Sequence, residues 1–229
     1  MQVVFFGVNQ LIPLVTEEML SFPSLCKNYI QLVAYLLEYF PHKLVELQPE
    51  LLNSLVKSLL YGLNHPVSTL GIAALKAMES MALFYWVETI QCRGQPVAPL
   101  QPHLDVLLEQ SLGSVLYRPF DSNLLGITSE TVFALIVART EAFKGIVVHI
   151  VSQQPQIRQQ RISESFASIV NTIEKLETQQ RTIVLASGSG SGGMLVGSHA
   201  GFRSNQDIVA FRIMFSRFLM EMRGWLVMK

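Results

Sequence analysis

The glycines and serines at residues 188–193 have the spacing of a dinucleotide-binding loop. The string Gly188-Ser189-Gly190-Ser191-Gly192-Gly193 fits GxGxxG, the apolar run 182–186 before it could form a strand, and Asp207 lies about where a ribose-binding acid is expected. That chemistry requires a helix directly after the glycines, so that its N–H groups point at the pyrophosphate. No βαβ pattern surrounds the segment, and three more loop-type residues follow instead: Gly197, Ser198 and Gly201. The composition favours a flexible linker over a cofactor site.

Other common catalytic and metal-binding motifs are missing from the sequence. A Walker A loop requires Lys after its last glycine, where this chain has Met194, and GxSxG does not occur. HExxH requires two histidines four residues apart, and no pair has that spacing among the five histidines: His42, His65, His103, His149 and His199. We therefore predict no enzyme activity, no catalytic residue, no metal site and no cofactor.

Three of these histidines have a predicted structural role. His42 follows Pro41 and His65 precedes Pro66, so both are predicted to be turn residues. His149 lies on an apolar predicted helix, where a partly buried side chain with a hydrogen-bond partner is expected.

Charged residues offer one weak candidate surface. The adjacent Glu17 and Glu18 point in different directions on a helix, so they are interpreted as solvated first-turn charges near Thr16 rather than as an acid/base pair. A small basic stripe consists of Arg158 and Arg161, with Arg181 later in the chain. It is either a solvated face or a contact surface for an acidic partner.

Aromatic residues gather at Phe84-Tyr85-Trp86 and, with helical spacing, at Phe211, Phe215 and Phe218. Such stripes are expected in a core first, although an aromatic side chain in a groove can anchor a partner. Cys26 and Cys92 lack CxxC spacing and are predicted to be buried free thiols in a reducing compartment.

The composition is that of a folded protein without a strong electrostatic field. Half of the 229 residues are hydrophobic, and 17 basic residues balance 17 acidic ones. Neither half of the chain is strongly charged, so nothing favours nucleic acid or anionic lipid as a partner. No stretch has the ~20 clean apolar residues of a membrane span, and Asn64-His65-Pro66 divides the uncharged residues 59–75 into two predicted helices. We expect a soluble intracellular protein without membrane insertion.

Prolines punctuate a series of amphipathic segments with a 3.6-residue period. Predicted helices begin at or near five of them: Pro23, Pro49, Pro66, Pro102 and Pro155. The first carries Leu25, Tyr29, Leu32, Val33, Leu36 and Phe40, predicted to share one apolar face, and ends at Pro41. Two further helices are predicted, one around Val132, Leu135 and Ile136 and one from Phe143 to about Gln153.

The spacing of the prolines predicts a two-helix repeat. Pro23 and Pro66 are 43 residues apart, with Pro49 between them, as in HEAT and armadillo repeats of ~40–47 residues. The predicted fold is all-α, a HEAT-like α-α superhelix (solenoid) of antiparallel helix pairs, and a compact helical bundle is the alternative. Residues 1–185 are assigned to the repeats, 186–205 to a Gly/Ser-rich flexible loop, and 206–229 to a C-terminal helix that packs on the last repeat. Because apolar residues 3–6 have no predicted partner, we expect a fragment of a longer stack.

The first 64 residues resemble a known family. The strings GVNQLIPLVT (7–16) and LSFPSLC (20–26), followed by Tyr29, Glu38, Pro41 and Lys43, are similar to the exportins, nuclear transport receptors of the importin-β superfamily. The similarity is greatest to the exportin-4-like receptors. It is good over residues 4–64 and fair over 205–229, where it is carried by Phe211, Phe215, Phe218-Leu219 and Arg223-Gly224-Trp225-Leu226.

This resemblance implies a C-terminal part of a receptor that binds protein cargo together with the GTP-bound GTPase Ran and shuttles between nucleus and cytoplasm through the nuclear pore. Implied partners are the cargo, among exportin-4 relatives a hypusine-bearing translation factor, as well as Ran and nuclear pore proteins. The main Ran-binding repeats of the family lie near its N-terminus. No residue is assigned to cargo contact. The alternative is a generic helical-repeat protein-binding scaffold outside nuclear transport.

Overall fold

A computed structural model describes residues 7, 10–91, 97–117, 122–187 and 205–226 of the chain. Helices and their connecting turns make up all of the regular structure in these residues, and the helices pack against one another in sequence. The predicted all-α helical-repeat fold is confirmed.

The α-helices of the described residues follow one another with short 3₁₀ helices between some of them. The α-helices are α2 (Glu17–Leu20), α3 (Pro23–Tyr39), α4 (Pro49–Leu63), α5 (Ser68–Gln91), α6 (Gln101–Tyr117), α7 (Leu125–Ala138), α8 (Thr140–Ser152), α9 (Gln156–Ser187) and α10 (Asn205–Trp225). The 3₁₀ helices are η1 (Ile12–Leu14), η2 (Pro41–Glu46), η3 (Ala98–Leu100) and η4 (Ser122–Leu124).

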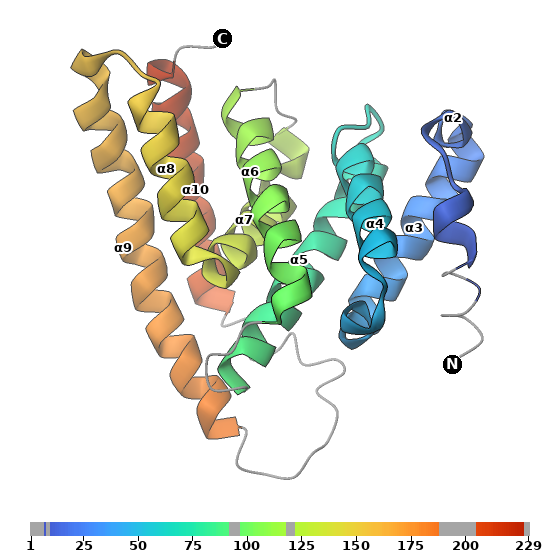
Figure 1. Ribbon diagram of the computed structural model, residues 1–229. Coiled ribbons are helices and arrows are strands. Elements are labelled where there is room, and N and C mark those ends of the chain that lie inside the picture. The colour runs from blue at the N-terminus through green and yellow to red at the C-terminus, as the bar shows by residue number, and fades with distance from the viewer. Residues whose placement is uncertain (1–6, 8–9, 92–96, 118–121, 188–204, 227–229) are drawn as a thin grey trace.

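Two rows of helices run side by side through the molecule (Figure 1). In one row α3 packs on α5 and α5 on α7, and in the other α4 packs on α6 and α6 on α8. α2 and α3 lie at one end, whereas α8, α9 and α10 lie together at the other. Because each pair of helices buries its apolar face against the next pair, one core runs along the stack.

Proline fixes where most of these helices begin. Pro23 and Pro49 are the first residues of α3 and α4, and Pro155 directly precedes α9. At these positions the missing N–H has no helical partner to lose, and the ring already has a helical φ. The predicted starts are confirmed, including those of α5, two residues after Pro66, and α6, whose second residue is Pro102.

The helix α5 lies in the centre of the stack, between α3 and α7. Residues 68–90 have the length and composition of a membrane span, so the expectation that no stretch reaches this length was wrong. Of the most apolar part of this helix, however, 72% is buried inside the fold. The apolar character of α5 is therefore accounted for by helices that cover it on both sides.

Small residues allow α4 to lie close to its neighbours. A Cβ atom at Gly62 would stand 3.1 Å from the Cβ of Ala74 on α5 and 3.4 Å from Cγ2 of Ile30 on α3. Ala74 and Ala77 of α5 are fully buried. A larger residue at position 62 therefore requires its neighbours on α3 and α5 to move.

Phenylalanine rings connect the helices at the far end of the stack. Neighbouring centroids are 4.7 to 6.1 Å apart in a series that runs from α7 through α10 and α9 to α8: Phe133, Phe211, Phe215, Phe218, Phe166 and Phe143. Each of these rings is buried. The predicted core role of Phe211, Phe215 and Phe218 is confirmed, and α10 belongs to the core although it follows residues 188–204.

An ion pair joins three helices near the middle of the stack. The Arg139 guanidinium, at the junction of α7 and α8, donates from Nε and Nη2 to the two carboxylate oxygens of Asp105 on α6, at 2.5 and 3.0 Å. Its Nη1 donates to the Tyr85 hydroxyl on α5 at 3.3 Å. The hydrogen bonds to Asp105 raise the pKa of Arg139. Because the two hydrogen bonds between Arg139 and Asp105 run parallel, they fix the relative orientation of the two side chains.

Replacing Asp105 by alanine is expected to lower the free energy of unfolding by about 1 kcal/mol, because Arg139 loses its bidentate partner. The loss is modest because the Asp105 side chain is 38% exposed and already partly hydrated. Urea unfolding followed by circular dichroism measures it. Glu141→Ala is the control, since the exposed Glu141–Lys144 pair lies on the surface of α8 and should contribute nothing measurable. Equal effects of the two substitutions would contradict the proposed role of the Asp105 pair.

Candidate interaction surfaces

The dinucleotide-binding alternative, which the sequence disfavoured, lacks its first structural element. Residues 182–186 lie in α9, so they do not form the strand that a GxGxxG loop must follow. Residues 188–204, which contain the glycines, Met194 and His199, lie outside the described residues. Most of the predicted loop 186–205 and residues 3–6 also lie outside the described residues.

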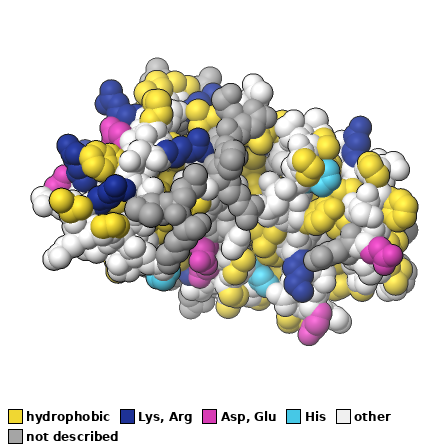
Figure 2. Space-filling model, turned by 90° about the horizontal axis from the view of Figure 1, so that it is seen from above, with side chains coloured by type: hydrophobic (Ala, Val, Ile, Leu, Met, Phe, Trp, Pro, Cys, Tyr) yellow, Lys and Arg dark blue, Asp and Glu magenta, His cyan; other side chains and the backbone are white. Residues whose placement is uncertain are grey.

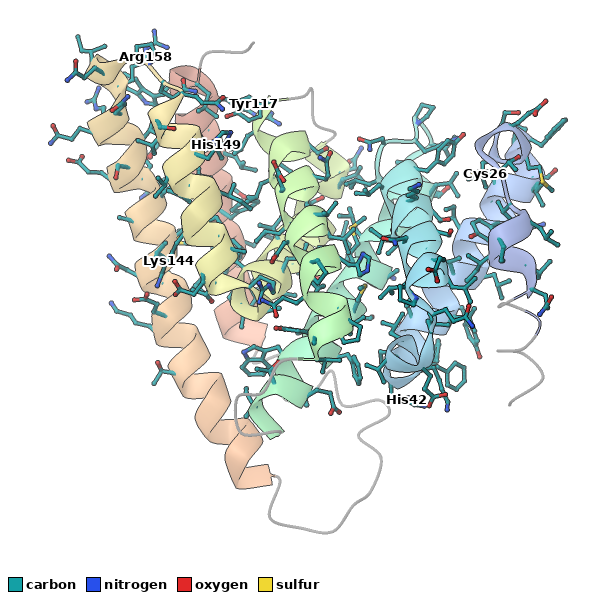
Figure 3. The ribbon with its side chains drawn as sticks, in the orientation of Figure 1. Cys26, His42, Tyr117, Lys144, His149 and Arg158 are labelled. Carbon is teal, nitrogen blue, oxygen red and sulfur yellow. The ribbon has the colours of Figure 1, made fainter. Side chains whose placement is uncertain are left out.

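His42 in η2 and His149 on α8 lie far apart in the molecule (Figure 3). His42 is exposed in η2, and His103 is half-buried on α6, where burial lowers its pKa. Among the described residues, no group of three His, Cys, Asp or Glu side chains could hold a metal ion.

The structure confirms the prediction for His65 and contradicts the one for His149. Nδ1 of His65 accepts a hydrogen bond from the N–H of Val67 at 3.1 Å, which confirms its role in the turn. His149 is exposed on α8, with Nε2 2.6 Å from Nε2 of Gln153, so the expectation of a partly buried side chain was wrong. The core face of α8 is carried by Phe143 and Ile150, and His149 lies outside it.

Two smaller predictions concern the start of the chain. Thr16 caps α2, since its Oγ1 accepts from the N–H of Met19 at 3.3 Å, and Glu18 is exposed in the first turn as predicted. Cys26 is a free, fully buried thiol whose pKa is raised by burial, which confirms the prediction for this cysteine. Cys92 lies outside the described residues.

The basic stripe of α9 contacts the end of α10. Arg158 donates from Nη1 to the carbonyl oxygen of Trp225 at 2.8 Å, and the Arg161 guanidinium lies over the Trp225 ring, 4.4 Å from its centroid. A cation at the C-terminus of a helix is favourable because the last carbonyl groups carry partial negative charge. Arg158 and Arg161 therefore hold α10 in place, and neither belongs to a purely solvated face. The side chain of Arg181 is not described.

Exposed apolar side chains concentrate at the opposite end of the molecule. Of fifteen exposed large hydrophobic residues in the described chain, seven lie within residues 11–39: Leu11, Leu14, Met19, Phe22, Leu25, Tyr35 and Tyr39. Apolar side chains are visible on the surface at this end in Figure 2, on the right, whereas Lys and Arg gather at the α8–α10 end on the left. Such a concentration marks an interaction surface.

The sequence interpretation missed this surface because it placed Leu25 in the buried stripe of the first helix. In the structure Tyr29, Val33 and Leu36 are buried, whereas Leu25 is exposed on the outer side of α3 together with Tyr35 and Tyr39. The signal was present as a second apolar series on the same helix. A helix that is apolar on two sides needs partners on two sides.

The second row of helices presents a different surface. The exposed strip of α4 carries Asn53 and Lys57, that of α6 carries Val106 and Glu109, and that of α8 includes Val148. α4 packs on α6 and α6 on α8, and we call the exposed strips of these three helices the α4–α6–α8 surface.

The chain matches a known protein family. The sequence model of the family described as Exportin-4 matches residues 1–182. The matched region contains α2 to α8 and most of α9, which includes both surfaces described above.

Proposed function

The chain belongs to the exportin-4 family of nuclear export receptors, and from this premise we propose that its helices bind protein cargo together with the GTP-bound form of Ran. The observation that carries the proposal is the family match over residues 1–182, on a helical-repeat fold. On this proposal the protein shuttles between nucleus and cytoplasm and contacts nuclear pore proteins during transit. The pairs α3–α4 and α5–α6 are HEAT-like repeats.

The arrangement of side chains supports recognition by surface contact. Stacked helix pairs create extended faces on which many weak contacts combine. We assign cargo contact to the α4–α6–α8 surface, where Val106 and Val148 are exposed between polar neighbours. The two valines offer apolar contact area within a polar surround.

A binding assay with the full-length gene product tests this function. The hypusine-bearing translation factor is immobilised, and receptor binding is measured with Ran loaded with a non-hydrolysable GTP analogue or with GDP. We expect the GTP form to strengthen cargo binding at least about fivefold, the lower range of coupling between two ligands. The translation factor without hypusine serves as the cargo control.

The contact surface is tested in the same assay with Val106→Glu and Val148→Glu combined. Both side chains are exposed, so the fold should tolerate the change, and cargo binding should fall while Ran binding stays. Ile157→Glu, at an exposed residue on α9, is the matched control. Cargo binding that ignores the nucleotide of Ran would sink the transport proposal and favour a generic helical-repeat scaffold.

A further inference from the structure

A single residue connects α7 to α8. Arg139 follows the last residue of α7 and precedes the first residue of α8, with φ −134° and ψ 50°, outside the helical range. Its N–H donates to the carbonyl oxygen of Leu135 at 2.9 Å, and its own carbonyl oxygen accepts from the N–H of Phe143 at 2.9 Å. Because only two backbone torsions separate the helices, rotation about either bond swings the whole of α8 relative to α7. The torsions of Arg139 therefore decide where α8 lies.

The side chain of the same residue is bound to two other helices. Nε and Nη2 donate to the carboxylate of Asp105 on α6, and Nη1 donates to the hydroxyl of Tyr85 on α5. With its amide oxygen turned toward Arg139, Gln101 on α6 accepts from Nη1 and Nη2 at 3.2 and 2.9 Å. A guanidinium carries five N–H groups in a rigid fork, so these bonds give every one of them an acceptor. The place and orientation of the guanidinium are thus set by α5 and α6.

Apolar packing holds α8 less firmly than it holds α7. Nine of the 14 residues of α7 are buried, but only two of the 13 residues of α8, Phe143 and Ile150. The Phe143 ring contacts Phe166, at a centroid distance of 6.1 Å, and so attaches α8 to α9. A helix with few buried contacts shifts at a low cost in free energy. The position of α8 beside α6 therefore depends on the side chain of Arg139 as well as on packing.

We propose that Arg139 is a positioning residue for the α4–α6–α8 surface. As a backbone hinge whose own side chain is anchored on α5 and α6, it holds the exposed strip of α8, with Val148, at a fixed spacing from that of α6, with Val106. A partner that spans both strips then finds them already in place, so binding does not have to order them at a cost in free energy. The link to cargo rests on the function proposed above, whereas the positioning of α8 does not.

Pulsed electron paramagnetic resonance of the 229-residue chain measures this positioning. Nitroxide labels are attached to cysteines introduced at the exposed residues Lys57 on α4 and Val148 on α8, roughly 20 Å or two interaxial distances apart. Cys92 is replaced by serine, and Cys26 is fully buried and so protected from the label. We expect Arg139→Lys to shift or broaden the distance distribution by about 1–2 Å or more, the size of helix movements at packed interfaces. Lysine keeps the charge but lacks the fork that binds three partners.

Two controls separate positioning from a general loosening of the fold. Glu141→Ala removes the exposed Glu141–Lys144 pair of α8 and leaves the guanidinium contacts intact, so it should keep the parental distance. Labels at the exposed residues Lys27 on α3 and Glu109 on α6 report a spacing that does not include α8, and it should stay the same in Arg139→Lys. A parental distribution in Arg139→Lys, or an equal change for both label pairs, would overturn the proposal.

Cargo binding by the full-length gene product distinguishes this inference from the function on which its link to cargo rests. Arg139→Lys should weaken cargo binding about 2- to 30-fold, the range for substitutions that change coupling without touching the ligand. The Arg139 side chain is only 15% exposed, so it offers cargo little direct contact. A changed spacing with parental cargo affinity would support the hinge and contradict the α4–α6–α8 surface as the cargo site. Weaker cargo binding with a parental spacing would overturn the hinge instead.

Discussion

Replacing Phe215 by alanine should lower the free energy of unfolding by about 3–5 kcal/mol, the cost of removing a fully buried aromatic side chain. The Phe215 ring has no exposed surface and stacks between Phe211 and Phe218, at centroid distances of 5.5 and 5.9 Å. Its helix, α10, contacts α6, α7 and α9. The substitution would therefore leave a cavity where these four helices meet, and chemical denaturation followed by tryptophan fluorescence measures the loss.

The control for this prediction lies two residues away on the same helix. The Ile213 side chain is 68% exposed, so Ile213→Ala should change stability by no more than about 0.5 kcal/mol. If Phe215→Ala were as mild as this control, α10 would not belong to the core. The comparison thus tests whether the residues that follow 188–204 are part of the folded unit.

The substitution Gly62→Val is expected to cost about 1–3 kcal/mol, as overpacking in a tight helix contact does. Its Cβ would approach the Cβ of Ala74 to 3.1 Å, and the two methyl groups of valine need further space. Valine also fills a helix position better than glycine does, but this gain of well under 1 kcal/mol is smaller than the cost of moving α4 away from α5. A urea titration reports the difference.

Gly145→Ala is the matched control, because nothing lies within 4 Å of a Cβ at this position on α8. Alanine there should stabilise the protein by about 0.5–1 kcal/mol, the usual difference from glycine inside a helix. A Gly62→Val protein that is as stable as the parent would mean that α4 and α5 lie further apart than the structure has them.

The sequence predicted the order and start of the helices well because the determinants are local. Proline acts within one helical turn, so Pro23 and Pro49 specify the first residues of α3 and α4 regardless of tertiary contacts. The argument against a helix of membrane-span length was wrong, because Asn64-His65-Pro66 ends one helix but leaves α5 itself long and apolar. Only the structure, in which α3 and α7 pack against α5, shows what covers this apolar helix.

The surfaces were harder to predict because they depend on contacts that are distant in sequence. Arg158 binds the carbonyl of Trp225, 67 residues later, which no periodicity on α9 reveals. Leu25 has the type and spacing of a core residue, and its exposure follows from which side of α3 receives α4 and α5. Periodicity identifies apolar faces, whereas tertiary packing decides which of two faces is covered.

The unequal distribution of aromatic rings has a mechanical consequence. From α7 to α10 the helices share one continuous series of large flat rings, whereas the contact of α4 with α3 and α5 includes the small residues Gly62 and Ala74. Small side chains interlock weakly, so sliding at this contact disturbs fewer atoms than sliding between stacked rings. When the stack bends, the end with α8–α10 would turn as one stiff block, and the change of curvature would be concentrated where α4 meets α5.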